Sequence, residues 1–368
     1  MTVADIDAVL LLSFGGPEAA DQVRPFLERV SRGRGVPPER LDEVEKQYLA
    51  VGGCSPINEQ NRRLRAAIEQ ELAARSSGEG ASIPVYWGNR NWHPFLADTL
   101  RQMRDDGIGT AAVVITSAYS SYSGCRQYRE DLAEASRVVQ DDGQGQAPLL
   151  LKVRRYFDHP AFVSVMADNI MAALGELPLD GPPPALIFTT HSIPVSSVAD
   201  SGPVDDPSQT YLSQHQFLAA RLAAIVGDRF GTPLTWDLVF QSRSGPPSVP
   251  WLEPDIGDHL TALAERGTRT AVIVPIGFIS DHMEVAWDLD VLALGRAREV
   301  GMTCVRAATV GTDTRFVSAL VDLVRERMNE VPTEQRPALG PWGPAPDLCP
   351  AGCCRNPRGS KPALCGLS

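Results

Sequence analysis

Apolar, β-branched runs recur along the chain at intervals that leave room for a helix between them. They lie at 8–14, 84–89, 111–120, 185–192, 235–242, 270–280 and 304–310. The intervening stretches include segments with helical periodicity, such as EQNRRLRAAIEQELAARS and QFLAARLAAIVG. Continuous apolar strands that alternate with helices are typical of a parallel sheet covered on both faces. The pattern therefore predicts an α/β protein with parallel sheets.

The strand pattern also occurs twice. AVLLLSFGGP resembles ALIFTTHSIP, and AAVVITSAYSSY resembles AVIVPIGFISDH. We therefore expect two Rossmann-like, doubly wound halves, at 1–150 and 151–335. The remaining tail, 336–368, is dense in proline and glycine, so it should be irregular. Without a ligand, such a composition does not bury enough apolar surface to stay ordered.

Composition adds limits on location and partners. The 368 residues are 43% hydrophobic and 21% charged, which is ordinary for a globular protein. A net charge of −11 disfavours nucleic acid as a partner, although a few local arginines can still bind an anionic ligand. The first residues lack the basic region of a signal peptide, and no run of 18 apolar residues follows. We expect a cytoplasmic monomer without a membrane span.

Polar residues at the ends of the predicted strands are the first candidates for function, because ligands of open α/β sheets bind there. His191 directly follows an apolar strand, and its imidazole can bind a metal or accept a proton. Glu284 and Asp288 share one helical face and suit proton transfer or the passage of cations. The alternatives are a hydrogen-bonded core or loop histidine and a solvated acidic face.

Arginines and tyrosines near other strand ends suit a flat, acidic ligand. Arg32, Arg34 and Arg90 lie in polar loops, and guanidinium groups bind carboxylates well. Tyr119 and Tyr128 supply aromatic surface near one strand end, although core packing explains most aromatic residues. The SFGGP segment lacks the glycines and lysine of a phosphate-binding loop, so we discount nucleotide binding.

Together, several segments resemble the ferrochelatase family. LLLSFGGP, GGCSPIN, YSSYSGCRQY, HSIP, FQSRSGPPSVPWLEP and GFISDHMEVAWDLD occur in the family's order and span nearly the whole chain before the tail. The resemblance implies two Rossmann-like halves of the class II chelatase type with a porphyrin cleft between them. It also implies an enzyme that inserts Fe²⁺ into a free-base porphyrin.

The resemblance implies roles for individual residues. The metal-facing histidine of the family falls on His191, its partner glutamate on Glu284, and the next acid along the helix on Asp288. Some members carry a third acid where this chain has Leu292, and an arginine where it has Gln47. Porphyrin contacts are implied for Phe14, which cannot ligate iron, and for Ser55 and Tyr128, with Arg32, Arg34 and Arg90 as partners for the acidic side chains of the porphyrin.

Four of the seven cysteines lie in the tail segment CPAGCCRNPRGSKPALCG. In a reducing compartment they are expected to be metal ligands rather than disulfides. The resemblance implies a [2Fe–2S] cluster held by Cys125 of the body with Cys349, Cys354 and Cys365. Cys353 is the alternative to Cys354, because adjacent side chains point in different directions. A structural zinc site and a ligand-free tail are further alternatives.

The substrate is inferred less directly. The absence of a membrane anchor and the actinobacterial style of the sequence favour coproporphyrin III, with coprohaem as product, over protoporphyrin IX. The expected partners are coproporphyrin III, Fe²⁺ and a downstream haem-pathway enzyme. Two other readings stay open, namely a cobalt or nickel chelatase for another tetrapyrrole and a non-catalytic haem-binding or cluster-sensing protein.

Overall fold

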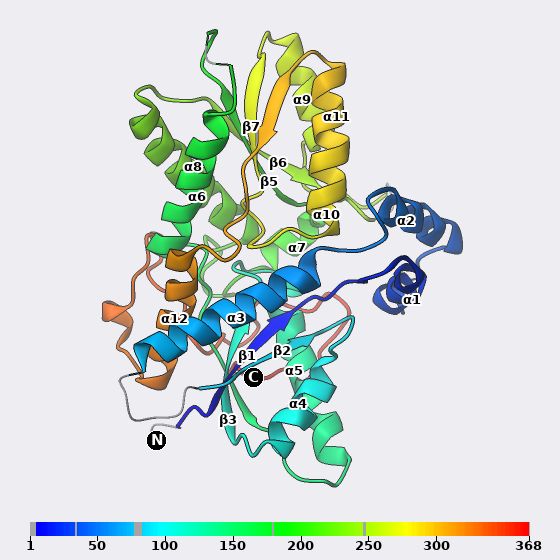
Figure 1. The fold of residues 1–368 in the computed structure, drawn as a ribbon, viewed down its shortest axis with the longest axis vertical. Helices are drawn as coiled ribbons and strands as arrows, with labels where there is room; N and C mark the ends of the chain where they lie inside the picture. Colours follow the sequence, from blue (N-terminus) through cyan, green and yellow to red (C-terminus); the bar gives the residue numbers. More distant parts are fainter. Residues whose placement is uncertain (1–4, 34, 77–82, 179, 246–247, 368) are drawn as a thin grey trace.

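A computed structural model describes residues 5–33, 35–76, 83–178, 180–245 and 248–367. Arg34 lies outside these residues, so its expected porphyrin contact stays a prediction. The described chain forms two parallel sheets that lie one above the other along the long axis of the molecule (Figure 1).

The first sheet contains four strands in the order β2–β1–β3–β4. Their bounds are β1 Ala8–Ser13, β2 Val85–Asn89, β3 Thr110–Ile115 and β4 Leu149–Lys152. All neighbours are parallel, and Leu11 of β1 pairs with Trp87 of β2 and Val114 of β3. Every residue of β1 is buried, because helices cover both faces of this central strand.

The second sheet repeats the first in the order β6–β5–β7–β8. Its strands are β5 Ala185–His191, β6 Trp236–Gln241, β7 Thr270–Val274 and β8 Thr303–Arg306, again all parallel. Strand for strand, β5 takes the place of β1 and β7 that of β3. The predicted fold class, an α/β protein with two Rossmann-like halves, is therefore confirmed.

Alternate side chains of each central strand face opposite helical layers, as the two-residue period of a strand requires. In the first half, Leu11 packs with Ile68 of α3, whereas Leu10 packs with Leu100 of α4 and Leu132 of α5. The helices are α1 Ala20–Ser31, α2 Pro38–Ala50, α3 Ile57–Arg75, α4 Leu96–Asp105, α5 Gln127–Asp141, α6 Pro160–Leu174, α7 Val195–Ala199, α8 Tyr211–Phe230, α9 Ile256–Glu265, α10 Met283–Val285, α11 Leu294–Glu299 and α12 Thr314–Met328, with a 3₁₀ turn at Thr333–Gln335.

The two halves share one apolar core. Val114 of β3 and Phe188 of β5 belong to the same buried cluster, which also includes Phe316 of α12. Helix α12 comes late in the chain but packs against α3 and β3 of the first sheet. The boundary expected at 150 falls inside β4. The division at 150 and 335 therefore stays a prediction about folding units.

A π-helical turn follows one central strand in each half. The turn η1 spans Tyr122–Arg126 after β3, and η2 spans Ala286–Ala293 after β7 and the short helix α10. Such wide turns insert a residue into the helical path and are frequent at functional sites. The expected candidates Cys125 and Asp288 lie in these two turns.

The tail, described from 336 to 367, contains neither helix nor strand in those residues, as its composition predicts. It is nevertheless tightly held. Arg336 forms a buried ion pair with Asp347 at 2.8 Å, and Trp342 packs against Phe157 and Phe217. Near its end, the Leu364 carbonyl accepts a hydrogen bond from Arg129 Nε at 2.7 Å. The tail thus contacts helices of both halves.

Candidate functional site

His191 and Glu284 meet although 92 residues separate them in the chain. His191 is the last residue of β5, and Glu284 lies in α10 beyond the end of β7. The distance from His191 Nε2 to Glu284 Oε1 is 3.5 Å, and their side chains are 30% and 45% exposed. The other ring nitrogen, Nδ1, contacts the Ser192 carbonyl oxygen, which fixes the ring with Nε2 toward the carboxylate.

Local hydrogen bonds hold Glu284 in position. The His282 ring accepts a hydrogen bond from the Glu284 amide at 3.2 Å and so caps α10. The side-chain amide of Gln241, at the end of β6, donates to the Glu284 carbonyl at 2.9 Å. Sequence reasoning missed both positioning residues, although His282 stands beside Glu284 in the same strand-end motif.

Each member of the pair shifts the proton affinity of the other. Burial, the largest single cause, disfavours the imidazolium. The charge of Glu284, the hydrogen bonds to Glu284 and Ser192 and the charge of Asp288 together outweigh it and raise the pKa of His191 to about 9. Burial alone would raise the pKa of Glu284, whereas the charge of His191 and their hydrogen bond lower it to about 2. The pair therefore consists of an imidazolium beside a carboxylate at neutral pH.

Asp288 lies in η2, and Ser242 donates a short hydrogen bond to it. Burial is the largest cause that raises its pKa, to about 7, and the charge of Glu284 adds to it. Asp288 can therefore exchange a proton near neutral pH. Ser242 has a φ of 62°, in the left-handed region, which turns its hydroxyl toward the acid. Further along, Leu292 is 51% exposed.

A fully buried polar network supports His191 from behind. The Tyr211 hydroxyl donates to the His191 carbonyl at 2.9 Å and contacts Thr190 Oγ1 at 2.7 Å. Thr190 also contacts His215, on which Tyr119 stacks with ring centroids 3.8 Å apart. Burial lowers the pKa of His215 to about 3, so this ring stays neutral. Tyr119 is thus a core residue rather than aromatic surface for a ligand.

Phe14 belongs to an aromatic cluster that also includes Met283 and Trp287, which flank Glu284 in the chain. The cluster contains Val23, Phe26, Leu27, Val30, Leu41, Val44, Tyr48, Val51 and Trp92 as well. These residues come chiefly from α1 and α2, which lie to one side of the molecule near α10 in Figure 1. Phe14 therefore shares one apolar cluster with the residues on either side of Glu284.

The other expected porphyrin contacts are placed differently. The guanidinium of Arg90 lies 4.3 Å from the centroid of the buried Tyr128 ring and forms an ion pair with Asp131. Arg90 therefore already has a carboxylate partner within the protein. Ser55 is buried against Gly16, and Arg32 is exposed at the end of α1. Of these residues, Arg32 is the one accessible to a ligand without rearrangement.

Four thiols form a separate buried cluster of Cys125, Cys349, Cys353 and Cys354. The sulfur atoms of Cys125 and Cys349 are 3.8 Å apart, and those of Cys353 and Cys354 are 3.7 Å apart. We expected adjacent cysteines to diverge, but Cys354 has a φ of 53°, and this left-handed backbone turns both thiols to the same side. The four-thiol cluster thus contains Cys353 and Cys354 together.

Cys365, expected to be a ligand, lies outside the four-thiol cluster. Its thiol donates to the Leu150 carbonyl at 3.2 Å and accepts from the Lys152 amide at 3.3 Å, which fastens the tail to β4. Of the two remaining thiols, Cys54 is exposed and Cys304 is half-buried. In the described part of the chain, no three or more histidine, cysteine or acidic side chains surround a position suited to one metal ion.

Comparisons with known proteins agree with the motifs. A family model described as ferrochelatase matches residues 6–328. The chain is 50% identical to the coproporphyrin III ferrochelatase of Streptomyces griseus, covering 99% of this chain and 96% of that protein. It is 46% identical to the coproporphyrin III ferrochelatase of Tropheryma whipplei, with 98% and 92% covered.

A solved structure, SirB from Bacillus subtilis with Fe³⁺, shares the fold. The TM-score is 0.50 at 10% sequence identity, with 90% of this chain and 99% of that chain covered. At this identity the likeness extends to the architecture of the two sheets alone.

Proposed function

The chain belongs to the ferrochelatase family, and we propose that it inserts Fe²⁺ into coproporphyrin III to give coprohaem. The observation that carries the proposal is the 3.5 Å approach of His191 to Glu284 at the carboxyl end of the second sheet. Relatives about 50% identical over nearly their whole length bear the name of this activity.

The proposed chemistry follows from what the substrate requires. A free-base porphyrin carries two inner N–H protons, which must leave as the metal enters. Once His191 has lost its proton, its Nε2 can contact Fe²⁺ or accept a proton from the ring, with Glu284 balancing the charge. Asp288, with its pKa near 7, can pass protons onward. We propose that the porphyrin lies between the two halves, with Phe14 and its aromatic cluster against one side.

Several further features support a substrate with four carboxylates, taken up from water. No helix among the described residues is long and apolar enough to cross a membrane. Arg32 is exposed and free to meet a carboxylate at the rim. We also propose that the protein acts as a monomer in the cytoplasm and hands coprohaem to a downstream haem-pathway enzyme. Native mass spectrometry and fractionation test these statements.

The decisive experiment is an anaerobic metallation assay of the purified chain. Coproporphyrin III and protoporphyrin IX are supplied with Fe²⁺, and sirohydrochlorin is supplied with Co²⁺. We expect the highest kcat/KM for coproporphyrin III, measured from the spectral change of the porphyrin. A higher value for protoporphyrin IX would correct the substrate, and turnover of sirohydrochlorin alone would replace the proposal with the cobalt chelatase alternative.

We further propose that the four-thiol cluster binds a [2Fe–2S] cluster. Two thiolates bound to one tetrahedral metal at about 2.3 Å lie roughly 3.8 Å apart. Both sulfur pairs have this separation, at 3.8 and 3.7 Å, which suits two irons with two thiolates each and equally suits the single ion of a structural zinc site. Cys125, Cys349, Cys353 and Cys354 would hold the group, which would supply cross-links between the tail and η1 and an electron-accepting centre.

Metal and sulfide analysis of protein purified anaerobically tests this assignment. We expect two irons and two sulfides per chain, and zinc alone would support the structural zinc alternative. Cys353→Ser should lose the visible absorption of the cluster, whereas the matched variant Cys365→Ser should keep it. The reverse result would support the ligand set that the family resemblance implies, with Cys365 as a ligand.

A further inference from the structure

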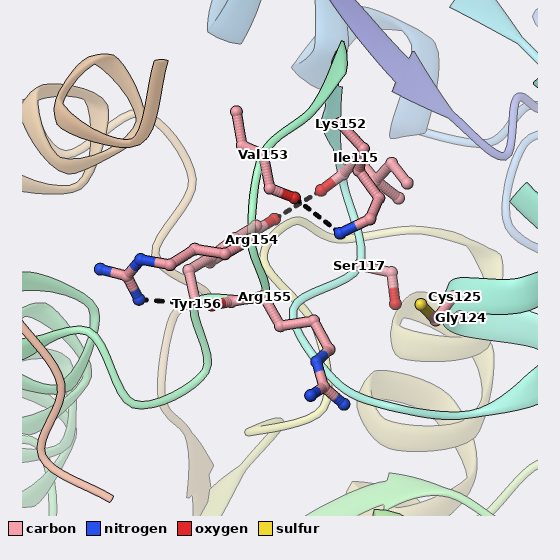
Figure 2. A pocket seen from close by; sticks show the side chains of 9 residues that line it. All are labelled: Ile115, Ser117, Gly124, Cys125, Lys152, Val153, Arg154, Arg155 and Tyr156. Atoms are coloured by element: carbon pink, nitrogen blue, oxygen red, sulfur yellow. Dashed lines mark hydrogen bonds between the residues drawn. The ribbon is translucent and has the colours of Figure 1, made fainter. Parts of the chain in front are cut away.

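Three buried cations lie around the four-thiol cluster. Arg129, Lys152 and Arg155 are 1%, 3% and 6% exposed. Nη1 of Arg129 and Nη1 of Arg155 have no hydrogen-bond partner within the described part of the chain. The pocket drawn in Figure 2 is lined by Cys125, Lys152 and Arg155, so thiol and cations border the same space.

The neighbouring arginine shows how this protein usually satisfies a buried guanidinium. Arg154 forms two hydrogen bonds with the buried Glu326, at 2.6 and 3.0 Å. Arg155, the next residue, has no carboxylate oxygen within 4.0 Å in the described part of the chain, and the same holds for Arg129 and Lys152. Burial of a charge without an opposite charge is strongly destabilising, so these three side chains require an anion close by.

The other buried acids of this region supply only part of that charge. Glu130 is already bound by Arg126 at 3.2 Å and by Asn356 at 3.1 Å. Asp158 interacts electrostatically with both Arg154 and Arg155, but it forms no ion pair with Arg155 within 4.0 Å, and burial raises its pKa. By contrast, burial lowers the pKa of Arg155, and the charges of all four thiol groups raise it above its ordinary value. Cys125 and Arg155 line the same pocket, so the four thiols, once ionised by a bound metal, would be the anionic partner of Arg155.

We propose that Arg129, Lys152 and Arg155 stabilise the reduced form of the [2Fe–2S] cluster and thereby set its reduction potential. This inference rests on the cluster assignment proposed above. Two Fe³⁺, two sulfides and four thiolates carry a net charge of minus two. One electron from an external one-electron donor converts one Fe³⁺ to Fe²⁺ and makes the charge minus three. Three cations match the reduced form, so their removal disfavours reduction.

The consequence is a cluster that accepts an electron readily rather than a purely structural cross-link. Low-dielectric surroundings make each fixed charge count more than it would in water. Arg155 makes no side-chain hydrogen bond to the described part of the tail, whereas Arg129 Nε donates to the Leu364 carbonyl. Arg155 is therefore the better position for a test that leaves the tail in place.

The test is a redox titration of the full chain, purified anaerobically, with dithionite as reductant and visible absorption as readout. Arg155→Gln should shift the balance of reduced to oxidised cluster at least tenfold toward the oxidised form, which is 59 mV for one electron. Arg155→Lys keeps the charge and should stay within threefold of the unmodified protein. Arg358→Gln removes an exposed charge of the same tail and should change nothing.

Lys152→Met provides a second variant if Arg155→Gln does not load the cluster, and it should shift the balance in the same direction. If both variants keep the ratio of reduced to oxidised cluster within threefold of that in the unmodified protein, the inference is overturned and the cluster assignment stays intact. An equal shift for Arg358→Gln would also overturn it, because the effect would then not depend on buried cations. Unmodified protein without iron–sulfur absorption would overturn the cluster assignment itself, and this inference with it.

Discussion

The two π-helical turns, η1 and η2, occupy equivalent places in the two halves and hold different chemistry. Each follows the strand that pairs with the first strand of its sheet, β3 in one half and β7 in the other. Ser121 caps η1 by accepting from the Gly124 amide at 2.8 Å, and His282 caps α10, which leads into η2, by accepting from the Glu284 amide at 3.2 Å. The fold thus places a capped turn after the corresponding strand in both halves.

Burial separates the two turns. Cys125 in η1 is 3% exposed because the tail covers it, whereas the side chain of Glu284, just before η2, is 45% exposed. A buried thiol suits a permanently bound metal group, whereas solvent-accessible carboxylates suit the transfer of protons or ions. The same topology therefore places both residues, and the tail makes the difference in exposure between them.

The largest expected effect comes from His191→Ala, which removes the group facing Glu284. Loss of a proton-transferring side chain typically costs about 10²–10⁴-fold in kcat. We expect this loss in the anaerobic metallation assay, with porphyrin affinity, measured by fluorescence quenching, nearly unchanged. His259→Gln, a buried histidine paired with Asp237 elsewhere, serves as control. Unchanged turnover in His191→Ala would contradict a catalytic role for His191.

Cys125→Ser removes the thiol that η1 contributes to the proposed cluster. We expect loss of the visible absorption and a fall in the free energy of unfolding of about 2–5 kcal/mol, similar to a lost covalent cross-link. Denaturant titration monitored by circular dichroism measures the fall. Cys54→Ser, at an exposed thiol, is the control and should change neither property. If Cys125→Ser keeps its colour, η1 has no ligand role.

Glu284→Gln tests how strongly the carboxylate of Glu284 raises the pKa of His191. The carboxylate raises the pKa of His191 to about 9, so its loss should return this pKa toward 6.5. The stabilisation from the raised His191 pKa is complete below pH 6.5 and disappears as pH rises through 9. The contribution of the lowered Glu284 pKa is present above about pH 4.5 and disappears as pH falls toward 2. NMR titration of the imidazole in metal-free protein follows the shift.

The smallest effect on stability is expected from a substitution at Leu292, the position at which the family resemblance implies a third acid in some members. Because the side chain is 51% exposed, Leu292→Glu should change the free energy of unfolding by less than about 0.5 kcal/mol. Thermal unfolding measures this change, and the metallation assay shows whether an added acid alters turnover. A rise in kcat would indicate that proton or metal transfer along η2 limits the reaction in this chain.

Much of the architecture was predictable because it depends on local pattern. Apolar runs of strand length separated by helical periods predicted the parallel sheets, and the repeated pattern predicted two halves. The structure adds that both halves have the same strand order. His191, Glu284 and Asp288 stood out because strand ends carry the ligands of such sheets. The positions of His215 and Arg90 were not predictable, because burial in a network or an ion pair depends on residues distant in the chain.

The sequence by itself determined the elements, their repetition and the chemical types present at the strand ends, since these follow from side-chain periodicity and composition. Only the tertiary structure decided which groups meet. It brought Nε2 of His191 to 3.5 Å from Glu284. It also placed the sulfur atoms of Cys353 and Cys354 3.7 Å apart, through a left-handed backbone at Cys354 that no residue pattern predicted. Contacts across long chain separations arise from packing of whole layers, and packing is a property of the folded core rather than of any local segment.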